Sequence, residues 1–265
     1  MKKYSALLAL VILAACNGNT GKEEPYDPSL ETRKTPLISY TIAAEYPHDT
    51  SAYTQGLEFY NGKLYEGTGD FETSSLRITD YKTGKVEQKH MMGTDSIFGE
   101  GITIFKDKIY QLTWESHIVY VYDISNINKP VKTFNWPYEG WGLTHNGTDL
   151  IISDGSAKLY FVNPDDFRLK STIRVSDNDS PVYSLNELEY VDGFVFANIY
   201  QTDKIVKIDP SSGLVVAKFD FGDALKNRFK STDRTDVLNG IAYDSATKKF
   251  LVTGKRWPKM FEVKF

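Results

Sequence analysis

Five copies of one sequence unit restrict what this chain can fold into. Each copy has a polar or glycine-rich turn, a short apolar strand, a tight turn and a second apolar strand. Aligned on the first apolar strand residue, the copies recur at intervals of 41 to 53 residues, at Leu57, Ile102, Leu143, Leu188 and Ile241. A third segment of alternating apolar residues follows each pair, as at 119–122 and 205–208, and a fourth follows in most copies.

Repeats of about 40–45 residues with four strands each are typical of β-propellers. We therefore predict an all-β fold, a five-bladed β-propeller of four-stranded blades. The fifth copy has three strands before Phe265, and residues 37–46 form a spare strand-like segment. We expect this N-terminal strand to complete the C-terminal blade and close the ring. A β-sandwich with chance similarity is the alternative, and five aligned copies argue against it.

The first residues predict an export signal rather than part of the fold. Residues 1–3 are basic, residues 6–15 are an apolar run too short to span a membrane, and small residues precede Cys16. This is the pattern of a secretory signal, and its end resembles a bacterial lipobox. Cys16 is the only cysteine, so it cannot form an internal disulfide. We expect it to be lipidated; a plain signal peptide with a coincidental cysteine is the alternative.

The expected organisation is a signal peptide over 1–15, a flexible tether over 16–36 and one domain over 37–265. Residues 17–36 are polar and hold too few apolar residues to fold alone, so they suit a tether to the membrane. These features predict a monomeric, lipid-anchored protein of a bacterial cell envelope, in the periplasm or at the outer membrane.

Charge and ligand spacing exclude several classes of function. The net charge is −4 and the pI is near 5.7, so no basic surface argues for nucleic acid. The four histidines have no ligand spacing to one another, so we expect no metal and no cofactor. Asp154 and Asp203 could suggest a calcium-dependent lactonase, but no convergent set of carboxylates accompanies them.

The repeat also predicts a polar ring at the mouth of the central channel. The first strand of each blade lines the channel and the second runs antiparallel to it, so the start of one and the end of the other lie on the same face. The residues two before the aligned positions are Gln55, Glu100, Trp141, Asn186 and Asn239. The ends of the second strands bring Trp114, Asp154, Tyr200 and Lys255 to that face.

Of the ring residues, Glu100 is the one that a purely structural role explains least well. A carboxylate beside indoles is desolvated, which raises its pKa and suits it to proton transfer. We expect the flanking glycines, Gly99 and Gly101, to clear space for a ligand. A plain Glu100–Lys255 ion pair is the main structural alternative, and any single amide of the ring could simply hydrogen-bond a neighbouring loop.

These segments together resemble the glutamine cyclotransferase family of plants and bacteria, whose members are five-bladed propellers. The resemblance covers nearly everything from Tyr53 to Phe265. It is carried by the segments YTQGL (53–57), FGEGIT (98–103), EGWGL (139–143), LNELE (185–189), NIYQTD (198–203), LNGIAYD (238–244) and VTGKRWPK (252–259).

The resemblance implies an enzyme that converts the N-terminal glutamine of a peptide to pyroglutamate and releases ammonia without a metal. Glu100 matches the family's acid/base glutamate. We expect Lys255 and Asn186 to assist catalysis, and the substrate to contact Gln55, Tyr53, Trp114, Trp141, Tyr200 and Asn239. Two positions depart from the family's usual pattern: Tyr53, where phenylalanine is common, and Tyr200, where tryptophan is common.

Two alternatives stay open. Residues 222–236 are a charged insertion before the fifth copy, which we expect on the channel-mouth face, either holding the peptide or as a solvated loop. Because propellers host many functions, a non-enzymatic lipid-anchored binding protein remains the alternative to a cyclotransferase.

Overall fold

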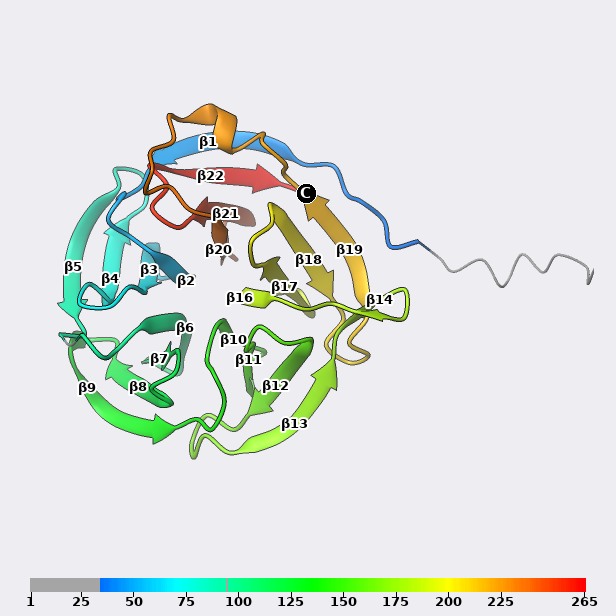
Figure 1. Ribbon diagram of the computed structural model, residues 1–265. Helices are drawn as coiled ribbons and strands as arrows, with labels where there is room; N and C mark the ends of the chain where they lie inside the picture. Colours follow the sequence, from blue (N-terminus) through cyan, green and yellow to red (C-terminus); the bar gives the residue numbers. More distant parts are fainter. Residues whose placement is uncertain (1–33, 94) are drawn as a thin grey trace, which may run out of the picture. The chain divides into compact units, whose positions relative to one another are not determined.

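A computed structural model describes residues 34–93 and 95–265. Five antiparallel sheets of four strands each stand around a central axis (Figure 1). The prediction of a five-bladed propeller is confirmed. In four blades the strands follow in chain order from the axis to the rim, because tight turns join neighbouring antiparallel strands.

The strand bounds place the five repeat copies at the centre of the ring. The first blade consists of β2 (Thr54–Tyr60), β3 (Lys63–Thr68), β4 (Ser75–Asp80) and β5 (Lys85–Met91). The second consists of β6 (Gly99–Phe105), β7 (Lys108–Thr113), β8 (Ile118–Asp123) and β9 (Asn126–Asn135). The third consists of β10 (Leu143–His145), β11 (Leu150–Ile152), β12 (Lys158–Val162) and β13 (Leu169–Arg174).

The fourth blade consists of β16 (Leu185–Val191), β17 (Phe194–Ile199), β18 (Lys204–Ile208) and β19 (Val215–Asp220). It is preceded by a small hairpin of β14 (Ser176–Asp177) and β15 (Ser180–Pro181). The fifth consists of β20 (Leu238–Asp244), β21 (Lys249–Gly254), β22 (Lys259–Lys264) and, from the other end of the described chain, β1 (Thr41–Pro47).

Strand β1 joins the two ends of the propeller. It pairs antiparallel with β22, with Thr41 opposite Lys264 and Pro47 opposite Lys259. The strand begins later than the expected 37–46, because the residues before it pair elsewhere. Leu37 forms a parallel bridge with Lys218 of β19, and Pro36 accepts a hydrogen bond from the Lys218 amide. The last residues of the predicted tether therefore already contact the fourth blade.

The predicted signal peptide, Cys16 and most of the tether lie outside the described residues. Within the described part of the chain, no helix has the length and apolar character needed to cross a bilayer.

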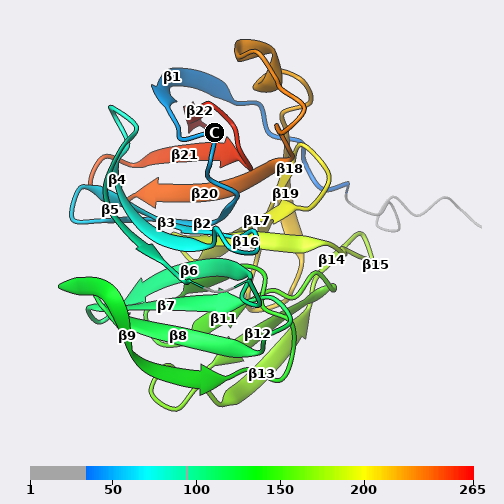
Figure 2. The ribbon, with the colours of Figure 1, turned by 60° about the vertical axis from the view of Figure 1, so that its left-hand side comes forward.

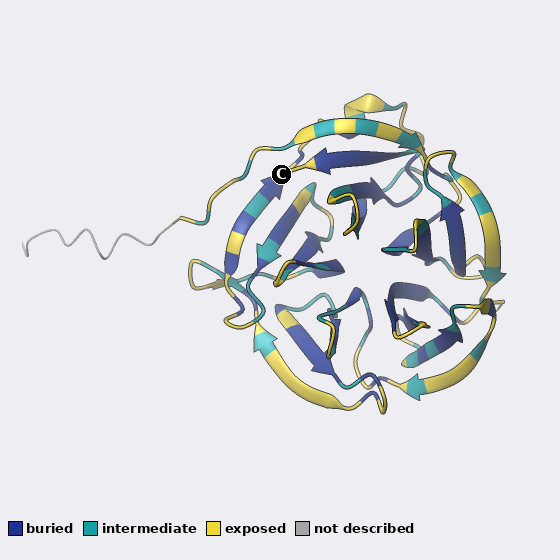
Figure 3. Ribbon diagram, turned by 180° about the vertical axis from the view of Figure 1, so that it is seen from behind, coloured by how far each residue is buried: buried dark blue, intermediate teal, exposed yellow. Residues whose placement is uncertain are grey.

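The hydrophobic core lies between neighbouring blades. The described residues form apolar clusters that each join two adjacent sheets; one of them, for example, packs Leu57 and Leu64 of the first blade against Leu251 and Met260 of the fifth. Burial falls from the axis to the rim, where the outermost strands carry most of the exposed strand residues (Figure 3). Each blade is therefore stabilised mainly by its neighbours, as ring closure requires.

The insertion lies at the rim of the fifth blade, beside β1 (Figures 1 and 2). It holds one short 3-10 helix, η2 (Lys226–Arg228), and Arg228 pairs with Glu45 of β1 at 3.2 Å. Its last residue, Asp236, donates its amide to the Lys255 carbonyl, and the Trp257 indole donates to the Asp236 carbonyl. The insertion thus supports the backbone of Lys255.

Candidate active site

Irregular pairing at the start of the inner strands turns the ring residues toward the channel mouth. The register between β6 and β7 shifts between Gly99 and Ile102, around Glu100. Comparable shifts surround Gln55 in β2, Asn186 in β16 and Asn239 in β20. Such a bulge frees a residue from the ladder and re-aims its side chain. The repeat therefore delivers a polar side chain to the cavity from the first, second and fourth blades, while the third blade contributes Trp141.

Gly101 serves blade packing rather than ligand approach, which corrects our expectation. Its amide donates to the Trp141 carbonyl at 2.8 Å. A Cβ added to Gly101 would lie 2.7 Å from both the Trp141 carbonyl oxygen and the Leu143 amide nitrogen. The space beside this glycine is occupied by the backbone of the third blade, so glycine allows the inner strands to meet.

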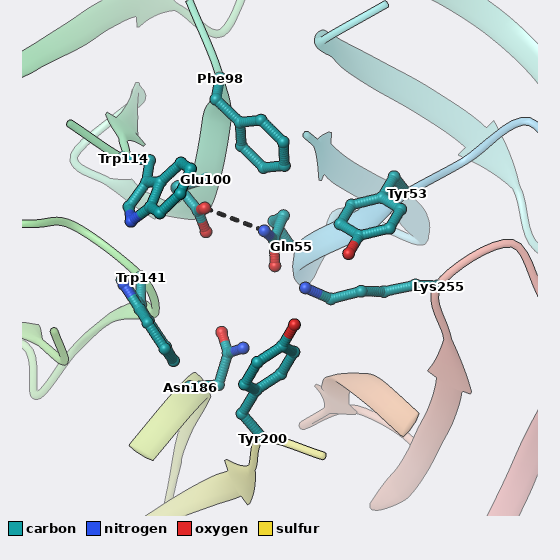
Figure 4. A pocket seen from close by; sticks show the side chains of 9 residues that line it. All are labelled: Tyr53, Gln55, Phe98, Glu100, Trp114, Trp141, Asn186, Tyr200 and Lys255. Atoms are coloured by element: carbon teal, nitrogen blue, oxygen red, sulfur yellow. Dashed lines mark hydrogen bonds between the residues drawn. The ribbon is translucent and has the colours of Figure 1, made fainter. Parts of the chain in front are cut away.

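Most of the predicted residues line one cavity of about 230 Å³ at the channel mouth (Figure 4). The structure thus brings together side chains from all five blades. The lining residues are Tyr53, Gln55, Phe98, Glu100, Trp114, Trp141, Asn186, Tyr200 and Lys255. Phe98 was not predicted, although it stands beside Gly99 and Glu100 in the quoted FGEGIT segment, and its place two residues before Glu100 was the available signal.

Two predicted face residues lie outside the lining. Asn239 is fully buried behind Gln55. The Asp154 carboxylate accepts hydrogen bonds from the Tyr160 hydroxyl at 2.7 Å and from the Ser156 amide. Its hydrogen bonds therefore stay within the third blade.

A chain of amides orients the Glu100 carboxyl. Asn239 Nδ2 donates to the Thr54 carbonyl at 2.9 Å and to Gln55 Oε1 at 3.1 Å. Because Gln55 Oε1 accepts, its Nε2 must face the other way, and it donates to Glu100 Oε1 at 2.9 Å. Asn239 therefore acts on the site through Gln55.

Glu100 is set up to hold and exchange a proton. Its side chain is 4 % exposed. Burial raises its pKa well above that of an exposed glutamate; Lys255 opposes this rise and Glu139 adds to it. Within the described residues, Glu100 Oε2 and Asn186 Oδ1 are buried without a hydrogen-bond partner. Buried polar atoms are normally paired, so these two are suited to a polar ligand.

Lys255 lies across the cavity from the tryptophans (Figure 4). It makes no ion pair with Glu100 among the described residues; its Nζ instead lies 4.5 Å from the ring centroid of Tyr53 and 5.0 Å from that of Tyr200. Burial lowers the pKa of Lys255 to about 8, against the raising effect of Glu100 and Asp236. The two tyrosines that depart from the family pattern thus flank this ammonium group.

Aromatic rings form the rest of the wall. Phe98 packs edge-on against Tyr53 and Trp114, at 5.9 and 5.8 Å between centroids. Trp141 packs edge-on against Tyr200 at 5.5 Å. Edge-to-face contacts of this kind hold rings in defined orientations. The apolar wall lowers the local dielectric, which strengthens electrostatic interactions inside the cavity.

The described residues contain no group of three or more His, Cys, Asp or Glu side chains placed to hold a metal ion. The cavity instead combines one acid of raised pKa, one cation of lowered pKa and two amides. Such a set can transfer a proton and stabilise a developing negative charge within one small ligand.

The chain is similar to known proteins over most of its length. The family model described as glutamine cyclotransferase matches residues 7–265. A glutaminyl-peptide cyclotransferase of Arabidopsis thaliana is 39% identical over 226 residues, which cover 84% of this chain and 70% of the plant protein. The crystal structure of Myxococcus xanthus glutaminyl cyclase superposes with a TM-score of 0.78 at 34% identity, covering 85% of this chain and 95% of that one. The chain belongs to the glutamine cyclotransferase family.

Proposed function

We propose that this protein is a glutaminyl-peptide cyclotransferase, which converts the N-terminal glutamine of peptides to pyroglutamate and releases ammonia. Family membership supports the reaction class. The single structural observation that carries the proposal is Glu100, a buried carboxyl group of raised pKa whose Oε2 is unpartnered in an aromatic cavity.

In this reaction the substrate's α-amine attacks its own side-chain amide carbon. A new carbon–nitrogen bond closes the five-membered ring, and the bond to the amide nitrogen breaks. The attack is intramolecular, so the cavity has only to hold the reactive conformer. The difficult part is proton transfer. Glu100 takes a proton from the attacking amine and returns one to the leaving nitrogen, which departs as ammonia.

The other lining residues have distinct roles in this proposal. Lys255 and Asn186 stabilise the carbonyl oxygen as it becomes negatively charged. Gln55 holds Glu100 in place and contacts the substrate, and Asn239 fixes the orientation of Gln55. The apolar wall for the glutaminyl side chain is formed by Tyr53, Phe98, Trp114, Trp141 and Tyr200.

Glu100→Gln tests the assignment. The variant keeps an oxygen that can accept from Gln55 but cannot exchange a proton, so we expect kcat for a glutaminyl dipeptide amide to fall roughly 10²–10⁴-fold. Ammonia release measures the reaction, and a thermal melt confirms that the variant is folded. Glu115→Gln is the matched control, because Glu115 is exposed and lies one residue from Trp114.

Normal turnover by Glu100→Gln would remove Glu100 from the mechanism. Absence of ammonia release by the wild-type protein, above the spontaneous rate of the peptide, would leave only the binding-protein alternative.

We also propose that the protein acts as a monomer anchored to a bacterial cell envelope by lipid on Cys16. One chain supplies every residue lining the cavity, and the pattern of residues 1–16 supports export and lipidation. Light scattering would then give the mass of one chain. Cells grown with labelled palmitate should label the wild type and not Cys16→Ser; an unlabelled wild type would contradict the anchor.

A further inference from the structure

The carboxylate of Glu139 joins the two tryptophans of the cavity. Glu139 Oε2 accepts a hydrogen bond from Trp114 Nε1 at 2.8 Å and another from Trp141 Nε1 at 2.9 Å. The two donors come from different parts of the ring, since Trp114 follows β7 and Trp141 precedes β10. One oxygen atom thus links the second blade to the third at the wall of the site.

We infer that Glu139 is a positioning residue for cyclisation, which fixes the two indoles of the substrate cavity through one shared acceptor oxygen. The inference rests on the proposed function and deepens it. The repeat pattern predicts no role for Glu139, although the residue lies in the EGWGL segment. Glu139 does not line the cavity, and burial has a larger effect on the pKa of Glu100 than Glu139 has, so its main effect on the substrate passes through the two indoles.

The shared acceptor constrains both rings at once. An indole has a single polar hydrogen and no acceptor. A half-buried indole N–H that lacks an acceptor therefore costs free energy. Figure 4 shows the nitrogens of Trp114 and Trp141 turned to the same side, away from the centre of the cavity. The polar edges therefore point to Glu139 behind the wall, and the apolar parts of the rings are left for the substrate.

The backbone of Glu139 is itself held in place. Its carbonyl oxygen accepts a hydrogen bond from the indole of Trp136 at 3.1 Å, and Trp136 is buried in the core between the second and third blades. A Cβ added to the next residue, Gly140, would lie 2.9 Å from Leu112 Cβ. The segment therefore packs tightly against the end of β7, and the Glu139 carboxylate reaches both indoles from a fixed backbone position.

Three variants test the inference. Glu139→Ala removes the acceptor and frees both rings. Because a displacement of about 1 Å can cost 10²-fold in rate, we expect kcat/KM to fall roughly 10- to 100-fold and indole fluorescence to change. Glu139→Gln keeps an acceptor oxygen at the same length, so it should restore the fluorescence and most of the rate. Glu115→Ala removes a nearby exposed carboxylate and should change neither.

A second comparison isolates the hydrogen bonds. Phenylalanine cannot donate, so Glu139→Ala should cost less in a Trp114→Phe background than in the wild type. Wild-type kcat/KM in Glu139→Ala would overturn the inference. So would a Glu139→Gln variant no closer to wild type than Glu139→Ala, or full additivity with Trp114→Phe.

The fluorescence of the free protein separates this inference from the proposed function. If the wild type does not cyclise glutaminyl peptides, the proposed function fails, while the response of the indoles to Glu139→Ala and Glu139→Gln still tests the shared acceptor. If the wild type is active and the variants leave both readouts unchanged, only the positioning role fails.

Discussion

Lys255 is a residue whose charge depends on pH within the working range of an enzyme. It is 2 % exposed, and burial brings its pKa down to about 8. Below that pH the ammonium group faces the cavity from above the rings of Tyr53 and Tyr200. Above it the group becomes neutral. If the cation stabilises the reaction's oxyanion, activity must decline as pH rises through the pKa of Lys255.

Lys255→Met tests this dependence. The change keeps an unbranched side chain of nearly the same length and removes its charge, so we expect a roughly 10²–10³-fold lower kcat/KM at neutral pH. The ratio of wild-type to variant kcat/KM should fall as pH rises through about 8, since only the wild type loses a charge there. The substrate amine ionises equally in both reactions and cancels in the ratio. A ratio that is independent of pH would exclude Lys255 as the charge involved.

At the scale of elements, the site depends on how closely neighbouring inner strands approach. Gly142, just before β10, faces β16 of the fourth blade. An added Cβ would overlap the carbonyl oxygen of Asn186. That strand start carries the Asn186 side chain into the cavity. Packing between two blades and placement of a site residue therefore depend on the same contact.

Gly142→Ala should disturb both the packing between the two blades and the placement of Asn186. Overpacking of this kind typically costs about 1–3 kcal/mol of unfolding free energy, or roughly 2–4 °C in Tm for each kcal/mol in a domain of this size. We expect a lower Tm and, because Asn186 shifts, a lower kcat. Gly147→Asn is the control in the same blade: nothing lies within 4 Å of a Cβ there, and asparagine tolerates its positive φ. Equal Tm values for Gly142→Ala and wild type would contradict this prediction, because they would show that the blades can move apart without loss of stability.

At the scale of the whole propeller, a buried histidine links the first and fifth blades, where the ring closes. His48 follows β1 directly, and its Nδ1 lies 2.8 Å from the Trp257 carbonyl of the fifth blade. Its Nε2 lies 3.0 Å from Glu66 Oε1 of the first blade, an oxygen that also accepts from Thr54. Burial alone would lower the pKa of His48, but the charge and hydrogen bond of Glu66 outweigh it, and the pKa is raised.

His48→Gln should loosen this closure in a pH-dependent way. Removing one partner of a buried ion pair costs about 3–5 kcal/mol. Because the folded-state pKa of His48 lies above its unfolded value, its stabilisation is complete below about pH 6.5 and is lost as pH rises through the folded-state pKa. The Tm difference between wild type and His48→Gln should therefore be largest near pH 6 and shrink in alkaline buffer. His117→Asn, at an exposed position, should show no such trend; a difference constant with pH would contradict the charged pair.

The amino-acid sequence alone determined the number of blades, the strand that completes the fifth and the face on which the site lies. These follow from local patterns, since alternation within a strand and turns between strands need no distant partner. The repeat also placed Gln55, Glu100, Trp141 and Asn186 at equivalent positions, and the structure brings them into one cavity.

Only the tertiary structure decided which groups meet across blades. Glu187 accepts hydrogen bonds from the Leu57 and Ile241 amides, in two other blades, and Glu139 accepts from two indoles. Asn239 lies behind Gln55, and Gly101 meets backbone rather than ligand. Such pairings depend on side-chain rotamers and on small differences in the spacing between blades. A one-dimensional pattern does not contain them, because they arise only when the ring has closed.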